Sequence, residues 1–179
     1  MERLPCGSMS HMAPTTDAPT FTIMMGLPAA GKSTTANGLF GDHQFIDCDA
    51  IKATHPDYDP KNPQALHAWS KGVEAGLLDA AFDNVSGNVL YDTTGTNEKK
   101  LRTLIAKAGE AGYRTRICFV TCFIETSLYR NSLRPRVVPE FVIREKADII
   151  NSVAANVRGL PTEFLMVENN ENDNSLIGQ

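Results

Sequence analysis

Short runs of β-type residues alternate along the chain with longer segments in which apolar residues recur every three or four positions. Compact runs rich in Val, Ile and Phe favour buried strands, whereas a spacing of three to four favours helices with one apolar face. Because the two kinds of segment alternate, the pattern is typical of a parallel sheet with helices on both faces. We therefore predict an α/β fold, a three-layer sandwich around a central, mainly parallel, five-stranded sheet.

The boundaries of these elements follow from the apolar pattern and from the turn residues that interrupt it. Strands are predicted at residues 21–25, 44–47, 88–91, 115–120 and 163–167. Helices are predicted at residues 32–40, 64–84, 97–111, 125–133 and 139–157. The segment 55–63 is rich in Pro and Asp, so we expect an irregular loop there.

The predicted helix 64–84 carries a stripe of apolar residues. Its members are spaced by three or four positions and are Leu66, Trp69, Val73, Leu77 and Ala81. Residues at this spacing share one face of a helix, and such a face normally packs on the sheet. We therefore expect Trp69 to belong to the hydrophobic core.

Size and charge narrow the classes of protein that remain. The chain has 179 residues, the size of one ordinary domain. Its formal net charge of −4 offers no overall positive field for nucleic acid or anionic membranes, so an anion site must be built locally. The longest apolar run, 117–124, is far shorter than the roughly 20 residues of a membrane helix. With no secretory signal pattern at the start, we expect a cytoplasmic location and no membrane contact.

The two ends of the chain lack a periodic pattern. Residues 1–19 mix Gly, Ser, Pro and Thr, and the run 7–12 resembles a cloning remnant, so we place the folded domain at 20–168. The Asn- and Glu-rich segment 169–179 is predicted to be a flexible tail. The cysteines have neither metal-site nor disulfide spacing, and we interpret them as reduced structural residues: Cys6, Cys48, Cys118 and Cys122.

The segment 26–33 reads GLPAAGKS and fits the phosphate-binding pattern G-x-x-x-x-G-K-[ST]. It follows a predicted strand and opens a predicted helix, where unpaired backbone N–H groups and the helix dipole attract anions. We expect Lys32 to reach the β- and γ-phosphates of a nucleoside triphosphate and the Ser33 hydroxyl to bind Mg²⁺. The predicted nucleotide-binding residues are Gly26, Pro28, Ala29, Ala30, Gly31, Lys32, Ser33 and Thr34. The loop itself distinguishes neither ATP from GTP nor a kinase from a switch.

Two acids close the second predicted strand, at the edge where open parallel sheets bind their ligands. Side chains alternate along a strand, so we expect Asp47 and Asp49 to share one face. Asp49 is the candidate base that takes the proton of an acceptor hydroxyl. Asp47 and Asp92, the latter at the end of the third strand, are candidate ligands of the Mg²⁺ water shell. The alternative is that the acids of the second strand only cap the turn that follows.

A basic stretch precedes the last predicted helix and contains Arg130, Arg134 and Arg136. Arg130 and Arg134 are four positions apart and therefore lie on one helical face. Phosphoryl transfer needs cations over the γ-phosphoryl group as charge spreads across its oxygens. We predict a lid at 126–138 in which Arg130 and Arg134 contact the nucleotide and act in catalysis. A solvated charged face is the ordinary alternative.

Together these elements resemble the zeta-toxin group of P-loop kinases. The resemblance rests on the phosphate-binding segment, on Asp49-x-x-Lys52-x-x-His55-Pro56, on Asp92-Thr93, and on Arg-x-x-x-Arg followed by Val-Pro. It implies a nucleoside-kinase-like P-loop fold that uses ATP and Mg²⁺ to phosphorylate a hydroxyl of a sugar nucleotide, typically UDP-N-acetylglucosamine. It also implies that the acceptor is contacted by Lys52, His55, Asp92, Thr93 and Arg136. His55 alone is equally consistent with shaping its loop.

The sequence departs from the family pattern in three respects. Family loops commonly carry Gly at the position of Ala29, so we expect the backbone there to avoid a conformation that only Gly tolerates. Lys52 stands where Arg is common, which removes bidentate recognition of a substrate phosphate. The chain is also compact and shows no evident antitoxin-binding extension. Toxicity and an antitoxin partner are therefore not implied.

Two other readings stay open. Polynucleotide kinases share the Asp-x-x-basic element, so the acceptor hydroxyl could lie on a nucleic-acid 5′ end or on a hydroxymethylated base. The net charge of −4 weighs slightly against this, because binding to phosphate backbones relies on cations. A nucleotide-dependent binding or switch protein is the third reading. Such a protein has no need for both an acid opposite the phosphate loop and an arginine lid.

Overall fold

The computed structural model describes residues 17–170, and statements above about residues 1–16 and 171–179 lie outside it. Within these bounds a five-stranded sheet has the order β2-β3-β1-β4-β5. The strands are β1 (Thr20–Gly26), β2 (Gln44–Ile46), β3 (Val89–Asp92), β4 (Arg114–Thr121) and β5 (Glu163–Glu168). Each neighbouring pair is parallel, so the predicted parallel sheet is confirmed.

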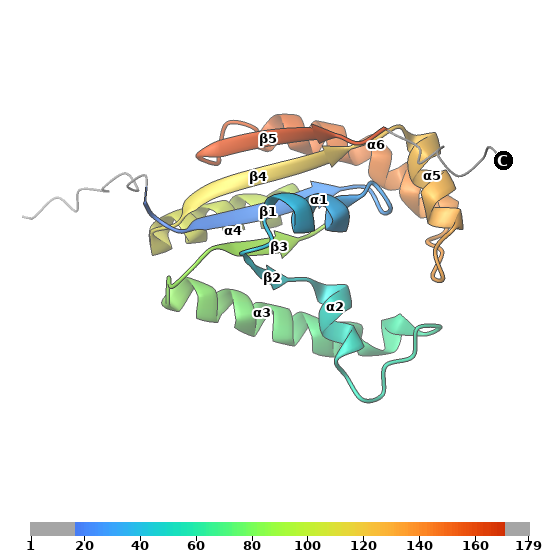
Figure 1. Ribbon diagram of the computed structural model, residues 1–179, viewed down its shortest axis with the longest axis horizontal. Helices are drawn as coiled ribbons and strands as arrows, with labels where there is room; N and C mark the ends of the chain where they lie inside the picture. The colour runs from blue at the N-terminus through green and yellow to red at the C-terminus, as the bar shows by residue number, and fades with distance from the viewer. Residues whose placement is uncertain (1–16, 171–179) are drawn as a thin grey trace, which may run out of the picture.

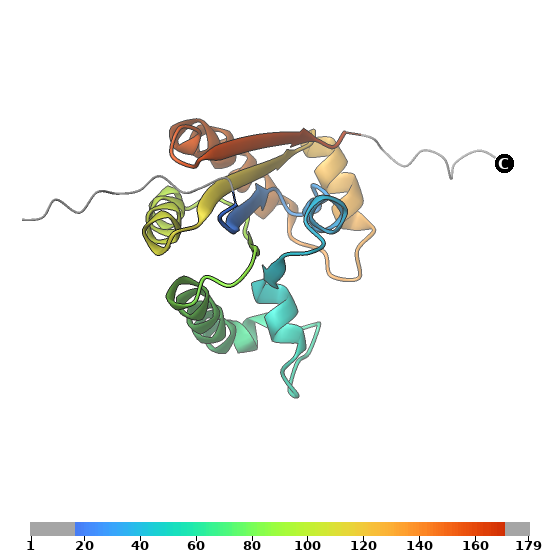
Figure 2. The ribbon, with the colours of Figure 1, turned by 60° about the vertical axis from the view of Figure 1, so that its left-hand side comes forward.

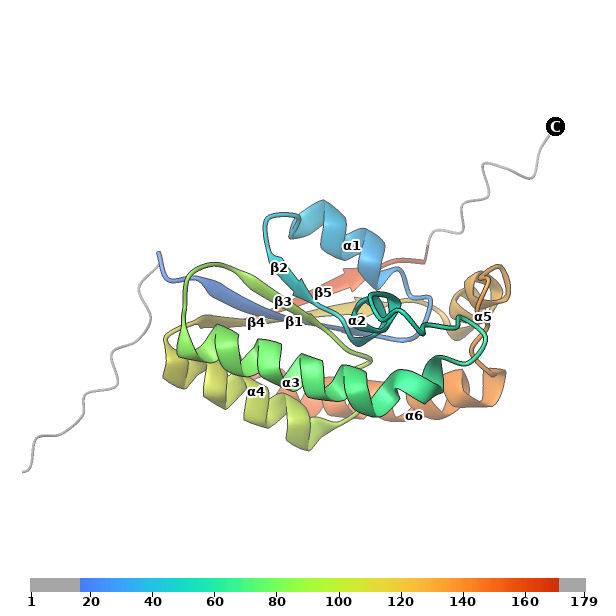
Figure 3. The same cartoon turned by 90° about the horizontal axis from the view of Figure 1, so that it is seen from below.

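Helices cover both faces of this sheet, as Figure 3 shows most clearly. One face carries α3 (His67–Asp83), α4 (Glu98–Ala111) and α6 (Glu140–Val157), and the other carries α1 (Lys32–Leu39). The remaining helical segments are α2 (Cys48–Ala53), the short 3₁₀ turn η1 (Pro63–Leu66) and α5 (Ile124–Ser132). The three-layer α/β sandwich expected from the alternating pattern is therefore present.

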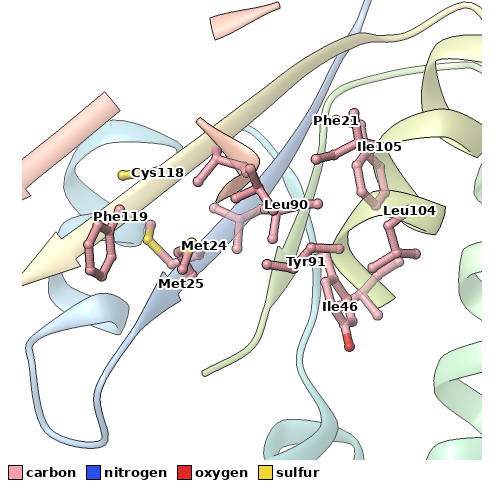
Figure 4. Close-up of a cluster of buried hydrophobic side chains, with 14 of the residues drawn as sticks. Phe21, Met24, Met25, Ile46, Leu90, Tyr91, Leu104, Ile105, Cys118 and Phe119 are labelled. Atoms are coloured by element: carbon pink, nitrogen blue, oxygen red, sulfur yellow. The ribbon is translucent and has the colours of Figure 1, made fainter. Parts of the chain in front are cut away.

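The core is centred on β1, whose seven residues are all buried. Phe21 packs against Phe82 and Tyr113, with ring centroids 5.2 and 5.9 Å apart. Figure 4 shows Phe21 of β1 and the side chains of β3 beside Leu104 and Ile105 of α4, while Cys118 and Phe119 of β4 lie nearer Met24 and Met25. A strand buried on both faces favours apolar residues at successive positions, and β1 accordingly has Phe21 and the run 23–25, although Thr20 and Thr22 are buried with them.

The central position of β1 also fixes the place of the site. In parallel pairing all carboxyl ends of the strands lie at one edge of the sheet. The strand arrows of Figure 1 point to the end where α1, α2 and α5 begin. The loops that follow β1, β2, β3 and β4 are therefore brought together, although they are far apart in the sequence.

The expected burial of Trp69 is wrong. The residue is 39% exposed, and its ring packs edge-on against His55 at 4.5 Å between centroids. The buried positions of α3 are instead Ser70, Glu74, Leu78 and Ala81. The buried face is rotated by about one residue, because the polar side chains of Ser70 and Glu74 find hydrogen-bond partners and can be buried.

Other elements differ from the prediction at their ends. The helix α2 was not predicted at all, and β2 ends one residue early, at Ile46. Asn97 caps α4 by accepting a hydrogen bond from the Lys100 N–H at 2.9 Å.

Within the described chain, Cys48, Cys118 and Cys122 are free thiols. Among the helices of residues 17–170, none combines the length and the apolar character needed to span a bilayer.

Candidate active site

The phosphate-binding segment lies between β1 and α1. Lys32 Nζ donates to the carbonyl oxygens of Gly26 at 3.2 Å and Leu27 at 3.3 Å, so its ammonium group is held against its own loop. Burial lowers the pKa of Lys32, whereas the negative charge of Asp92 opposes this effect. The lysine is thus placed inside the loop that the sequence assigned to phosphate.

The start of α1 offers unsatisfied backbone donors. Gly31 is its N-cap residue, with φ 93°, and no side chain caps the helix. The first turn of α1 also contains no acidic residue. The side chains of Ser33 and Thr34 are exposed on this turn. Free N–H groups at the positive end of a helix are a ready-made anion site.

The expectation for Ala29 is wrong. Its φ is 59°, the left-handed region that favours glycine. In this region the Cβ of an alanine comes close to the following carbonyl oxygen, which costs about 1–2 kcal/mol. The tight curvature of the loop between Leu27 and Gly31 therefore overrides the local preference of residue 29.

The expected strand alternation of Asp47 and Asp49 is also wrong, because β2 ends before either residue. Asp47 is the N-cap of α2, and its Oδ1 accepts a hydrogen bond from the Asp49 N–H at 2.8 Å. Asp49 lies on the first turn of that helix, with its side chain 63% exposed. The capping alternative thus describes Asp47, while the Asp49 carboxylate is left open to the site.

The Asp49 carboxylate is held between two cations. Lys52 Nζ lies 3.0 Å and Arg136 Nη1 lies 3.4 Å from Asp49 Oδ1. Partial burial opposes ionisation, but the hydrogen bond and charge of Lys52, together with Arg136, bring the pKa of Asp49 below its usual value. Asp49 is consequently a carboxylate at neutral pH. Lys52 is itself buried, so the structure directs it to Asp49.

Asp92 ends β3 opposite the phosphate-binding loop. Its Oδ1 is buried and has no hydrogen-bond partner. Burial raises the pKa of Asp92 to about 6, and the charges of Asp47 and Asp49 add to this rise while Lys32 opposes it. Asp47, Asp49 and Lys32 are therefore close enough to act on Asp92 through their charges.

The loop after β3 is tied to β1. Thr93 N–H donates to the Met24 carbonyl at 3.0 Å, and Gly26 N–H donates to the Thr94 carbonyl at 3.2 Å. The Thr93 hydroxyl accepts a hydrogen bond from Gly95 N–H at 3.3 Å. Thr93 is therefore fixed beside the start of the phosphate-binding segment.

The predicted lid begins with α5, which Figures 1 and 2 both place beside the loop preceding α1. The Ser127 hydroxyl donates to the Pro28 carbonyl at 2.6 Å. Farther along, the Asn131 side chain donates to the Val138 carbonyl at 2.8 Å and accepts from the Val138 N–H at 3.0 Å. Both ends of the arginine stretch are thereby anchored.

The lid arginines occupy three different surroundings. Arg130 donates to the backbone and side-chain oxygens of Asn169, at 3.1 and 3.4 Å. Arg134 is exposed, and its charge contributes to the low pKa of Lys32. Arg136 meets Asp49, as described above. The positive charges thus extend from the phosphate-binding loop to the candidate base.

Two groups near the site were missed by sequence reasoning. The predicted tail 169–179 begins with Asn169, whose N–H donates to the Thr121 carbonyl at 2.8 Å. Glu74 is 4% exposed and is paired with Lys71 and Lys100, both at 2.8 Å, while Tyr91 donates to it at 3.1 Å. The signal for Asn169 was its place directly after a strand that ends at the ligand edge.

His55 shapes its loop in this structure. Its Nδ1 accepts a hydrogen bond from the Asp57 N–H at 3.1 Å, and its ring packs on Trp69. These contacts account for the side chain locally. They agree with the simpler of the two sequence interpretations.

The residues present fit a Mg²⁺ ion. Within residues 17–170 no three His, Cys, Asp or Glu side chains form a ready metal cluster. Mg²⁺ does not require one, because it binds phosphate oxygens and waters with only one or two protein ligands. The unpartnered Asp92 Oδ1 and the Ser33 hydroxyl are hard oxygen donors of the required kind.

A parallel sheet of this order, with a phosphate-binding loop after its central strand and Arg130 beside that loop, is a P-loop nucleotide-binding fold. The family model described as zeta toxin matches residues 7–179, and the chain belongs to that family. A comparison with curated proteins by sequence yields no match.

Solved structures share the fold. A structure of AvrRxo1-ORF1:-ORF2 with ATP has 14% identity and a TM-score of 0.68, over 84% of this chain and 55% of that chain. The PezAT toxin-antitoxin system of Streptococcus pneumoniae has 16% identity and a TM-score of 0.65, over 84% and 69%. Shikimate kinase from Acinetobacter baumannii has 17% identity and a TM-score of 0.55, over 87% and 86%. The chain thus spans little more than half of the AvrRxo1 chain that it matches.

Proposed function

We propose that the protein is an ATP- and Mg²⁺-dependent kinase that transfers the γ-phosphate to a hydroxyl of a sugar nucleotide or a similar small substrate. The observation that carries this proposal is the open Asp49 carboxylate, which faces the lid through Arg136 and influences Asp92 across the site. A protein that only binds nucleotide has no use for an ionised acid at this place. Family membership supports the same chemistry.

The donor nucleotide is bound by the first part of the site. Backbone N–H groups at the start of α1 and the Lys32 ammonium group bind its phosphates. Ser33 and Asp92 would hold Mg²⁺, with Asp47 nearby as a second-layer acid that already caps α2. Bound Mg²⁺ neutralises charge on the β- and γ-phosphate oxygens. Arg130 and Arg134 add positive charge where it develops during transfer.

The acceptor is activated by Asp49. Because cations keep its pKa low, the carboxylate is ionised and can accept a hydrogen bond from the acceptor hydroxyl. As the hydroxyl oxygen bonds to the γ-phosphorus, the bond from that phosphorus to the β-phosphate oxygen breaks and ADP leaves, while the hydroxyl proton passes to Asp49. Lys52 fixes the carboxylate from one side. Arg136, which is paired with Asp49, and Thr93, in the loop after β3, would contact the substrate.

The proposal is tested by replacing Asp49 with Asn. We expect Asp49→Asn to bind ATP as the wild type does, while transfer of phosphate to the acceptor falls by about a hundredfold or more. Asp83→Asn is the matched control, because Asp83 is an exposed aspartate at the far end of α3. ATP binding is measured by calorimetry and transfer with labelled ATP. Undiminished transfer by Asp49→Asn would remove the proposed base.

A further inference from the structure

Asn169 links three parts of the site, although it lies just beyond the last strand. Its backbone N–H donates to the Thr121 carbonyl at 2.8 Å, which fixes it to the end of β4. Its side-chain nitrogen Nδ2 donates to the Ala30 carbonyl at 3.0 Å. The amide is therefore bonded to the phosphate-binding loop itself.

The same amide packs directly on Gly31. A Cβ atom at Gly31 would collide with Asn169 Nδ2 and would come within 3.9 Å of Arg130 Nη1. Gly31 thus meets two requirements, its left-handed φ of 93° and the space taken by the asparagine. This close contact leaves the Asn169 side chain little freedom to turn.

The oxygen atoms of Asn169 face the lid. Its backbone carbonyl accepts from Arg130 Nη1 at 3.1 Å, and its side-chain Oδ1 accepts from Arg130 Nη2 at 3.4 Å. Two acceptors on one residue match two nitrogens of the planar guanidinium group. Arg130 is thereby oriented beside Gly31, where the nucleotide phosphates are expected.

From this geometry we propose that Asn169 is a positioning residue, which holds the Arg130 guanidinium group against the phosphate-binding loop for contact with the nucleotide. The proposal rests on the proposed function, because it assumes that Arg130 binds the nucleotide. An arginine already held in place loses less side-chain freedom when a phosphate binds. Loss of Asn169 should therefore weaken nucleotide binding through Arg130.

The chemistry of the side chain explains why asparagine suits this position. An amide offers a donor and an acceptor at the same time. Aspartate keeps the acceptor for Arg130, but its carboxylate cannot donate to the Ala30 carbonyl and adds negative charge beside the phosphates. Alanine loses both side-chain bonds while leaving the backbone contacts to Arg130 and Thr121 possible.

A double-mutant cycle separates this role from a merely structural one. Binding of a fluorescent ATP analogue is measured for the full chain as wild type, Asn169→Ala, Arg130→Ala and the double variant. We expect each single variant to lower affinity by about fivefold or more, and the double variant to fall no further than the weaker single variant, because coupled residues are not additive. Asn170→Ala is the control, since within residues 17–170 the Asn170 side chain accepts from the Phe123 N–H at 2.7 Å and donates to Glu168, not to the phosphate-binding loop. We expect the affinity of this variant to be unchanged.

Each outcome of the cycle decides a different claim. If Arg130→Ala lowers affinity and Asn169→Ala does not, or if the two losses multiply, the positioning role is overturned and the proposed function stands. If Arg130→Ala binds the analogue as tightly as the wild type, the assumed nucleotide contact fails and the inference falls with it. Melting temperatures without nucleotide check folding, and Asn169→Asp replaces Asn169→Ala if the latter is unfolded. The aspartate variant should also lose affinity, and wild-type affinity for it would overturn the proposal.

Discussion

Arg136 of the lid is paired with Asp49 at the start of α2, with 3.4 Å between Arg136 Nη1 and Asp49 Oδ1. These residues lie far apart in the chain, both after the phosphate-binding loop, and the pair joins the lid to the candidate base. The contact means that acceptor activation and lid position are electrostatically connected. A change at Arg136 should therefore alter the titration of Asp49.

Arg136→Ala should raise the pKa of Asp49, because a nearby positive charge favours the ionised carboxylate. The acid limb of the pH profile of kcat/KM for the acceptor should then move to higher pH. Arg144→Ala is the control, since Arg144 pairs with Glu140 on an exposed part of α6. An acid limb that stays in place while the rate falls would show that Arg136 acts on the substrate alone.

Asp92→Asn should stabilise the protein at neutral pH. The pKa of Asp92 is raised to about 6 from an ordinary value of 3.8, so the folded state holds this proton more tightly than the unfolded state. Ionisation of Asp92 in the folded state therefore costs stability above pH 7, on the order of 3 kcal/mol. Urea unfolding of wild type, Asp92→Asn and the exposed control Asp148→Asn at pH 4 and pH 8 measures this. An equal effect of Asp92→Asn at both values would contradict the assignment.

Ala29→Gly should raise the free energy of unfolding by about 0.5 kcal/mol. The left-handed φ of 59° strains alanine, and this gain exceeds the added entropy of glycine in the unfolded chain. Ala36→Gly, inside α1, should instead lower it by about 1 kcal/mol. Thermal and urea unfolding of both variants is the measurement. Destabilisation by Ala29→Gly as large as that by Ala36→Gly would argue against the strained loop.

Glu74→Gln should lower the free energy of unfolding by about 1–3 kcal/mol, because it weakens a buried, fully bonded ionic cluster. Lys71 and Lys100 keep the pKa of Glu74 below its usual value against the effect of burial. The stabilisation from ionised Glu74 is therefore present above the pKa of an unfolded glutamate. It is lost as the pH falls through the lower pKa of Glu74 in the folded protein. Glu110→Gln is the control, because Glu110 is exposed on α4. If the difference in unfolding free energy between Glu74→Gln and wild type does not shrink in acid, this account is contradicted.

The strands and the phosphate-binding loop could be predicted because their signals are local. A buried parallel strand requires a continuous apolar run, and the loop requires fixed spacing between Gly26 and Lys32. The helix α2 was missed because its six residues are too few for a periodic pattern. The burial of Trp69 was misjudged because periodicity locates a helical face only to within about one residue, and Ser70 and Glu74 are buried through their bonds.

The arrangement of the site depends on contacts that no local pattern encodes. Asn169 lies in a stretch whose composition is typical of a flexible tail, yet it is bonded to residues 30 and 130. The pairing of Arg136 with Asp49 likewise joins segments that only the sheet topology brings together. Residue types and spacing therefore indicated which side chains could act, while their partners required the folded chain.

The most direct test of the account is the fate of the γ-phosphate. The protein is incubated with γ-labelled ATP and Mg²⁺ and, separately, with pools of sugar nucleotides, oligonucleotides and hydroxymethylated DNA, with Lys32→Ala and Asp49→Asn in parallel. We expect label on a sugar-nucleotide hydroxyl with the wild type, none with Lys32→Ala, and about a hundredfold less, or lower still, with Asp49→Asn. Label that appears only as inorganic phosphate in every pool would contradict transfer to an acceptor, and label on nucleic acid alone would contradict the small-substrate assignment.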